Sequence, residues 1–438
     1  MSILSKDGAF AILGKVLSYS KAEGCEANLN GGLSGNIRYA RNTVTTSGTV
    51  SDMTLVVQSN YGKRAGTATI NEFDDASLEK VVRRSEELAK LAPENPEFVE
   101  VLGPQEYLES KAHFATTAGI TPEYRAQAAA HSIEPSKEKK LVAAGFLEDN
   151  NGFESMMNSK GLKAYHASTD VNFSVTVRTE DGTGSGYVTR DYNDLTLLDT
   201  GRASRIAIDK AVMSREARAI EPGKYTVVLE PAASIGLLQR MLGNFDGRQA
   251  DEGRSFLAKP GGGVKLGEKI VDERVTVYSD PTEAAIPAAP FASDGRARKR
   301  VTWIDKGVVK NLYYSRYWAQ KKGVEAVPFP ANGVMLGGEE SLEDLIKGTK
   351  KGVLVTRTWY IRTVDPQTLL YTGLTRDGTF FIEDGKIAFP IKNMRFNESP
   401  VIMLNNIDAL GRPERIDGSL IPPMRLRDFT FSSLSDAV

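Results

Sequence analysis

Three polar residues occupy a position where a helix could carry catalytic chemistry. Gln239, Arg240 and Asn244 lie in a predicted helix that follows an apolar strand at residues 225–230 and a break at Pro231. Such a helix could mount a zinc site, which needs imidazole, thiolate or carboxylate ligands and a base that accepts a proton from bound water. This helix offers two neutral amides and a guanidinium, which stays protonated. The segment therefore predicts neither a bound metal nor catalysis.

Other residues that could carry chemistry have simpler structural interpretations. Asp246, Asp251 and Glu252 could hold a cation through oxygen ligands, but a solvated loop is the favoured interpretation. Cys25 shows no partner base, so it is expected to be a small buried residue rather than a nucleophile. Ser234 lies in no Gly-x-Ser-x-Gly elbow and is expected near a helix N-terminus. Because the chain has only three histidines and one cysteine, a site with several converging zinc ligands is not expected.

The glycine-rich segments and the basic run also have alternative explanations. Gly261–Gly263 and the glycines within 182–186 lack the lysine and hydroxyl of a phosphate-binding loop, so flexible or tight-turning loops are expected. The run at 296–300 could contact phosphate, but it is better explained as solvated residues of a strand that leaves the Asp294–Gly295 turn. With 55 Lys and Arg against 56 Asp and Glu, the net charge of −1 argues against direct nucleic-acid binding.

The size and composition of the chain predict a cytoplasmic globular protein. The sequence has 438 residues, of which 41% are hydrophobic and 25% charged, so two or three domains with substantial cores are expected. No apolar run approaches the roughly 20 residues that a membrane helix needs. The N-terminus does not resemble a signal peptide. The single cysteine excludes an internal disulfide framework and is consistent with a reducing compartment.

The order of the predicted elements indicates an α+β fold. We expect an N-terminal α/β sandwich-like unit, followed by a β-rich C-terminal domain with mixed and antiparallel sheets. Three regions are predicted: an N-terminal α+β domain at 1–92, a linker and middle α/β region at 93–222, and a β-rich domain at 223–438 that carries the helix of Gln239.

Local signals place several of these elements. Helix starts are predicted at Asp74 or Asp75, Thr121, Asp199 and Ser341, where a side chain can cap the first turn. Residues 167–177 alternate between polar and apolar, which predicts a strand with one buried face formed by Val171, Phe173, Val175 and Val177.

Several segments, taken in order, resemble the TldD/PmbA family, formerly called modulators of DNA gyrase, and in particular its PmbA or TldE-like branch. They cover nearly the whole chain and lie at residues 37–42, 225–231, 254–257, 290–295, 304–308 and 381–387. The catalytic TldD branch carries His-Glu-x-x-x-His on the helix after the second of these segments, and a later cysteine as a further zinc ligand. In this chain the three motif positions fall on Gln239, Arg240 and Asn244, and no cysteine follows residue 400. The resemblance therefore implies a chain without zinc or another cofactor.

The resemblance also implies a partner. TldD and its PmbA-type relative form a heterodimeric peptidase that degrades unfolded peptides and trims peptide precursors. We therefore expect a non-catalytic subunit, paired with a TldD-type zinc subunit or with a second copy, that handles peptide and contacts neither nucleic acid nor membrane. The alternatives are a metal-independent hydrolase and a non-enzymatic peptide-binding or topoisomerase-regulating protein.

Arg240, Asn244 and Asp246 are the candidate substrate-binding residues. The guanidinium of Arg240 could bind the C-terminal carboxylate or a carbonyl of a peptide. The favoured interpretation is that Arg240 fills the vacated space and forms an ion pair with Asp246 or Glu252.

Overall fold

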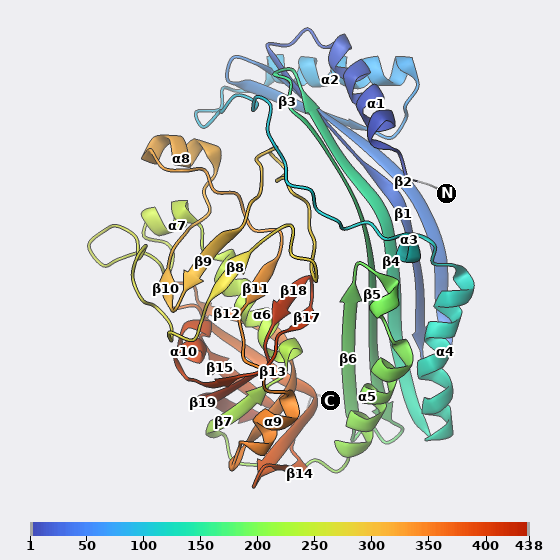
Figure 1. Ribbon diagram of the computed structural model, residues 1–438, viewed down its shortest axis with the longest axis vertical. Helices are drawn as coiled ribbons and strands as arrows, with labels where there is room; N and C mark the ends of the chain where they lie inside the picture. The colour runs from blue at the N-terminus through green and yellow to red at the C-terminus, as the bar shows by residue number, and fades with distance from the viewer. Residues whose placement is uncertain (1–2, 436–438) are drawn as a thin grey trace.

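The computed structural model describes residues 3–435, which form a long curved sheet standing beside a β-rich body (Figure 1). The long sheet has the strand order β3-β2-β1-β4-β5-β6, and all its pairings are antiparallel. Its strands are β1 (Gly24–Ala40), β2 (Thr43–Tyr61), β3 (Arg64–Ile70), β4 (Leu141–Asn158), β5 (Lys163–Thr179) and β6 (Ser185–Tyr192). The structure confirms the predicted α+β class with a β-rich C-terminal part.

The centre of this sheet joins strands that are far apart in the sequence. β1 pairs with β4 from Glu26 opposite Asn158 to Tyr39 opposite Gly145, so the sheet spans residues from both the 1–92 and 93–222 regions. The predicted alternation in β5 is confirmed, since Val171, Phe173, Val175 and Val177 are buried.

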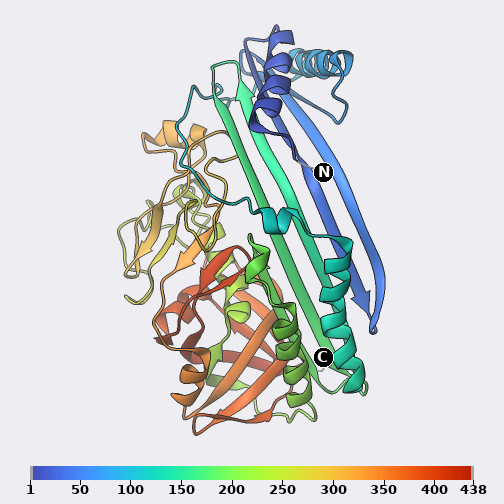
Figure 2. The same cartoon turned by 45° about the vertical axis from the view of Figure 1, so that its right-hand side comes forward.

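Helices cover one face of the sheet at its two ends (Figure 2). They are α1 (Lys6–Tyr19) and α2 (Asp75–Leu91) at one end, and α4 (Pro122–Glu138) and α5 (Thr200–Met213) at the other. The short α3 (Ala115–Ala118) lies between these pairs and contacts a 3₁₀ turn at Leu195–Leu197. α1 and α2 pack on a cluster that includes Leu29, whereas α4 and α5 pack on one that includes Ile37. These two residues lie an even number of positions apart on β1, and therefore on the same face. Asp74, Thr121 and Asp199 cap α2, α4 and α5 as predicted.

The C-terminal body contains two sheets. One has the order β12-β7-β19-β15-β13-β14, with β16 on β19, and a pairing of β12 with β13 closes five of these strands into a ring. The other has the order β10-β9-β8-β11-β18-β17. The strands are β7 (Gly223–Leu229), β8 (Val277–Ser279), β9 (Val301–Asp305), β10 (Val308–Val309), β11 (Gly333–Met335), β12 (Lys351–Asp365), β13 (Leu370–Glu383), β14 (Lys386–Pro390), β15 (Met394–Glu398), β16 (Ile407–Leu410), β17 (Glu414–Ile416), β18 (Ser419–Ile421) and β19 (Met424–Leu434).

Short helices complete this body, and one of them, α6, directly follows a strand of the ring. The helices are α6 (Pro231–Gly243), α7 (Gly247–Asp251), α8 (Arg316–Lys322), α9 (Leu342–Lys347) and α10 (Pro400–Asn405). α6 follows β7 directly and buries Leu237, Leu238 and Met241 in the largest core cluster. The predicted capping box at the start of α9 is confirmed, since Ser341 and Asp344 exchange hydrogen bonds. None of the helices in the described part of the chain is long and apolar enough to span a membrane.

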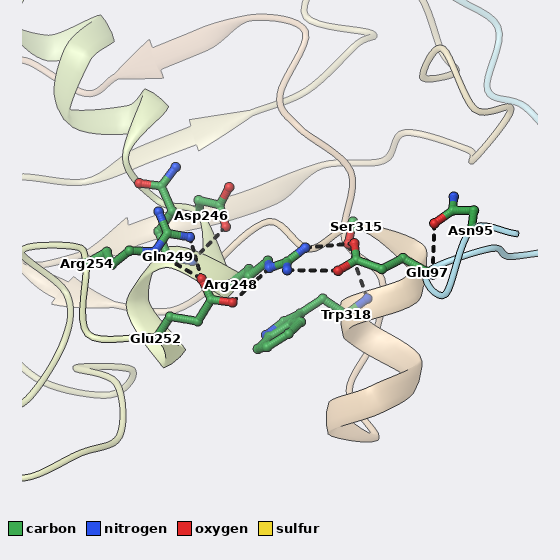
Figure 3. Close-up of polar contacts among 9 residues, drawn as sticks. All are labelled: Asn95, Glu97, Asp246, Arg248, Gln249, Glu252, Arg254, Ser315 and Trp318. Carbon is green, nitrogen blue, oxygen red and sulfur yellow. Dashed lines mark hydrogen bonds and ion pairs between the residues drawn. The ribbon is translucent and has the colours of Figure 1, made fainter. Parts of the chain in front are cut away.

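Several contacts tie the body to the long sheet. β6 lies against β13 and β17 (Figure 1). The segment between α2 and α3 crosses the body, where Glu97 accepts two hydrogen bonds, of 2.8 and 2.9 Å, from the guanidinium of Arg248 (Figure 3). Arg248 also lies over the ring of Trp318 on α8, 4.8 Å from its centroid. The helix that carries Gln239 and Arg240 is therefore held within a body anchored to the long sheet.

Candidate functional site

The end of β7 leads into α6 through a short, rigid connection. The backbone N–H of Glu230 donates to the carbonyl of Val355 on β12, and Pro231 occupies the first turn of the helix. Ser234 is fully buried and donates to the carbonyl of Pro231, so it is a first-turn hydroxyl as predicted. The helix buries its apolar face and leaves Gln239 and Arg240 exposed near its C-terminal end.

Arg240 binds main-chain carbonyls instead of a carboxylate. Its Nη1 donates to the carbonyl of Gly236 at 2.8 Å, and its Nη2 to the carbonyl of Ile361 on β12 at 3.4 Å. The guanidinium carbon lies 5.9 Å from the ring centroid of Tyr371. No ion pair joins Arg240 to Asp246, Glu252 or any other carboxylate within residues 3–435, so the expected ion pair is wrong.

The carboxylates of Asp246 and Glu252 have other partners than Arg240 (Figure 3). Asp246 caps α7 by accepting from the backbone N–H of Gln249. Glu252 pairs with Arg248 and Arg254. The physical reason for the missed prediction is that each acidic side chain has a nearer donor on its own short helix or in the adjoining loop.

Asn244 forms the C-terminal cap of α6. Its side-chain amide donates to the carbonyl of Arg240 at 2.8 Å, and its own carbonyl accepts from the hydroxyl of Ser255. Asn244 therefore caps the C-terminus of α6 and Asp246 caps the N-terminus of α7. Neither residue lines the pocket described below. Of the three candidate substrate-binding residues, Arg240 alone faces that pocket.

The residues at the motif positions do not fit zinc. Gln239 and Asn244 offer neutral amides, and the cation of Arg240 would repel a dication. Within residues 3–435, no group of three or more His, Cys, Asp or Glu side chains is placed to hold a metal ion. Asp251 was a possible cation ligand together with Asp246 and Glu252. Its carboxylate instead accepts a hydrogen bond from the indole N–H of Trp318 at 2.7 Å and forms an ion pair with Lys322.

A pocket of about 360 Å³ lies beside the exposed side of α6, at the small end of the usual range for ligand sites. Its wall is formed by α6, the second half of β12, β6 and the turn after β17. Arg357 lies in this wall between two rings, 3.7 Å from the centroid of Tyr187 and 4.4 Å from that of Trp359. Its Nη1 also donates to the buried carboxylate of Asp377 at 2.8 Å. The wall is therefore fixed by a buried ion pair.

A bulge in β12 turns aromatic side chains toward this pocket. The pairing of β12 with β13 shifts register between Trp359 and Arg362, and Tyr360 has a φ of 55°. A non-glycine aromatic residue rarely adopts this conformation, and such outliers gather at functional sites. Trp359 is 43% exposed and Tyr360 56% exposed. These residues were not predicted from the sequence, although the run of aromatic and basic residues at 357–362 was a visible signal.

The basic run at 296–300 is less exposed to solvent than predicted. Arg296 donates to the carbonyls of Tyr314 and Ala326 and pairs with Asp294. Arg298 is partly buried and donates to the carbonyl of Phe291 at 2.7 Å. The expectation of solvated residues is wrong for these two, because their guanidinium groups bind main-chain carbonyls of neighbouring segments.

Two side chains that can take part in acid–base or nucleophilic chemistry, Cys25 and His166, are buried. Cys25 is fully buried, as predicted, and burial raises the pKa of its thiol, which makes the thiolate scarce. His166 is 7% exposed, its Nε2 has no hydrogen-bond partner within the described residues, and burial lowers its pKa to about 4. Neither group is placed for acid–base chemistry near neutral pH.

Comparison with known structures gives close agreement in fold. A candidate modulator of DNA gyrase from Thermotoga maritima superposes with a TM-score of 0.86 at 16% identity, covering 96% of this chain and 99% of the other. A candidate modulator of DNA gyrase from Bacteroides thetaiotaomicron gives 0.86 at 22% identity, covering 98% and 100%. TldE from Thermococcus kodakarensis gives 0.85 at 18% identity, covering 97% and 99%.

Comparison of sequences finds curated relatives named for proteolysis. A protein named metalloprotease from Methanothermobacter thermautotrophicus is 25% identical over 294 residues, which is 61% of this chain and 62% of that protein. A metalloprotease TldD homolog from Buchnera aphidicola is 24% identical over 275 residues, which is 56% of each. The matches thus span less than two thirds of these relatives' lengths.

Models of a single protein family match most of the chain in sequence order. They are PmbA/TldA metallopeptidase domain 1 at residues 25–89, the central domain at 122–215 and the C-terminal domain at 222–433. Together with the segments at 225–231, 290–295 and 381–387, these matches account for both the long sheet and the β-rich body. The chain therefore belongs to the PmbA/TldD metallopeptidase family.

Proposed function

We propose that this chain is the zinc-less subunit of a cytoplasmic TldD/TldE-type metallopeptidase that cleaves unfolded peptides or peptide precursors. The observation that carries the proposal is α6, which follows β7 directly and presents Gln239, Arg240 and Asn244 at the positions to which the family resemblance assigns the zinc motif. These groups can neither hold zinc nor take a proton from bound water. The catalytic zinc is then supplied by the partner subunit.

Several observations support this role over independent catalysis. The buried thiol of Cys25 has a raised pKa, and the hydroxyl of Ser234 donates to its own helix. The pocket beside α6 has no histidine in its wall. A peptidase without metal would need an activated nucleophile with a base in hydrogen-bond range. Neither Cys25 nor Ser234 meets that requirement, whereas handling of an unfolded peptide needs only binding surface.

The proposal is tested by mixing the purified chain with a homologue that carries His-Glu-x-x-x-His. We expect the chain alone to show no zinc by mass spectrometry and no hydrolysis of a fluorogenic unfolded peptide. The mixture should form a 1:1 complex by light scattering and show hydrolysis that a chelator abolishes. A matched mixture, in which the homologue's motif glutamate is replaced by glutamine, should form the same complex without hydrolysis.

Two results would contradict the proposal. Hydrolysis by the chain alone that persists in chelator would favour a metal-independent hydrolase. Failure of the chain to associate with any such homologue, together with specific capture of gyrase, would favour a regulatory protein.

A further inference from the structure

The pocket beside α6 has more positive charge than its own carboxylates neutralise. Three guanidinium groups line it, from Arg240, Arg357 and Arg362, and one carboxylate, from Asp417. Arg357 is neutralised by its ion pair with the buried carboxylate of Asp377. Two guanidinium groups are therefore left against one carboxylate.

The two remaining arginines are accessible and lack acidic partners. Arg240 is exposed and donates to two main-chain carbonyls, and Arg362 is exposed and lies over the ring of Tyr360, 4.5 Å from its centroid. Neither forms an ion pair with any carboxylate in the part of the chain that the structure describes. A guanidinium has five N–H donors, so Arg240 keeps donors free for a ligand after its two carbonyl bonds.

Apolar and aromatic groups adjoin these charges. Trp359 and Tyr360 are exposed on the β12 bulge, and Ile235 contributes an aliphatic wall from α6. The ion pair of Arg357 and the stacking on Tyr187 and Trp359 hold this wall in place before any ligand arrives. A pocket of this kind suits a ligand with an anionic end and an adjoining apolar side chain.

We propose that this pocket binds the free C-terminus of an unfolded peptide. The terminal carboxylate accepts hydrogen bonds from Arg240 and Arg362, and the last side chain packs against Trp359 and Ile235. A volume of about 360 Å³ suits the last one or two residues of a peptide. This inference deepens the proposed function, and it makes the zinc-less subunit an anchor for the end of the substrate.

A peptide terminus fits the pocket better than a nucleic acid does. Aromatic and arginine side chains can also stack with bases. However, backbone recognition of a nucleic acid needs a basic track, and this pocket holds the carboxylate of Asp417. The chain as a whole carries a net charge of −1. By contrast, a peptide terminus presents one carboxylate next to an apolar side chain, and the two accessible guanidinium groups are enough to bind it.

The test compares one unstructured peptide in two forms, with a free C-terminal carboxylate and with a C-terminal amide, by titration calorimetry on the isolated full chain. We expect the free acid to bind at least about tenfold more tightly, because charge-assisted hydrogen bonds are lost in the amide. Arg240→Gln and Arg362→Gln should each remove most of this difference. Arg240→Lys should keep part of it, and Arg84→Gln, which changes an exposed arginine of α2, should keep all of it.

The outcomes separate this inference from the proposed function. Equal binding of acid and amide by the wild-type chain would overturn the inference, and this result needs no variant to fold. Displacement of the peptide by a single-stranded oligonucleotide at equal concentration would also overturn it. Because the isolated chain is used, failure to associate with a zinc subunit leaves this test unaffected, and loss of the acid preference leaves association unaffected.

Discussion

Replacing Asp377 with asparagine should loosen the junction between the β-rich body and the long sheet. Asp377 on β13 is 1% exposed, and its carboxylate accepts from Arg357 at 2.8 Å and from the hydroxyl of Ser185 on β6 at 2.6 Å. It therefore joins a strand of the body to a strand of the long sheet. Its φ of 56° is left-handed, a conformation that asparagine also tolerates, so Asp377→Asn removes the charge with little backbone cost.

The magnitude follows from the burial of the pair. The Arg357 side chain is 17% exposed, so solvent screens the interaction weakly. Removing one partner of a buried ion pair costs about 3–5 kcal/mol, because the other charge stays buried. Since the asparagine oxygen can still accept one hydrogen bond, we expect Asp377→Asn to lower the free energy of unfolding by about 3 kcal/mol.

Urea denaturation followed by tryptophan fluorescence is the appropriate assay, because Arg357 lies against the ring of Trp359. A double-mutant cycle with Arg357→Met should give a coupling free energy of about 2 kcal/mol or more. As a control, Arg412→Gln breaks the exposed pair with Glu339 and should change stability by less than about 0.5 kcal/mol. A coupling between Asp377 and Arg357 no larger than the effect of this control would refute the reasoning.

Three further substitutions probe the long sheet. Asp149→Ala leaves the buried guanidinium of Arg125 unpaired and should cost about 3–5 kcal/mol, measured by chemical denaturation. Gly186→Ala places a methyl group 2.1 Å from the carbonyl oxygen of Ala207 on α5 and should lower the melting temperature, since overpacking costs about 1–3 kcal/mol. Burial lowers the pKa of His166 from 6.5 to about 4, so the unfolded chain binds more protons between these values. Burial of neutral His166 therefore stabilises the fold fully above pH 6.5, and the free energy of unfolding decreases as the pH falls from 6.5 toward 4. His166→Phe should make the free energy of unfolding, measured by chemical denaturation, less dependent on pH in this range.

The parts of the fold that depend on local chemistry could be predicted from the sequence. The caps at Asp74, Thr121, Asp199 and Ser341 follow from side chains that bind backbone N–H groups three residues away. The buried face of β5 follows from alternation alone. Pairing of β1 with β4 could not be predicted in this way, because it joins residues more than a hundred positions apart and the local pattern does not specify a partner.

The candidate site was predictable in its chemistry but not in its contacts. The residue types at Gln239, Arg240 and Asn244 are sufficient to exclude zinc ligation. The partners of Arg240 depend on where β12 passes α6, and the bulge that exposes Trp359 and Tyr360 depends on the pairing of β12 with β13. Neither feature is a property of a short stretch of sequence.

The proposed role of this chain requires that α6 cannot hold a metal. The decisive measurement is the zinc content of the purified chain after dialysis against excess zinc and removal of free metal. We predict well below one equivalent per chain, unchanged in a Gln239→Ala, Asn244→Ala double variant. One equivalent of zinc that this double variant loses, while it remains folded, would contradict the central claim.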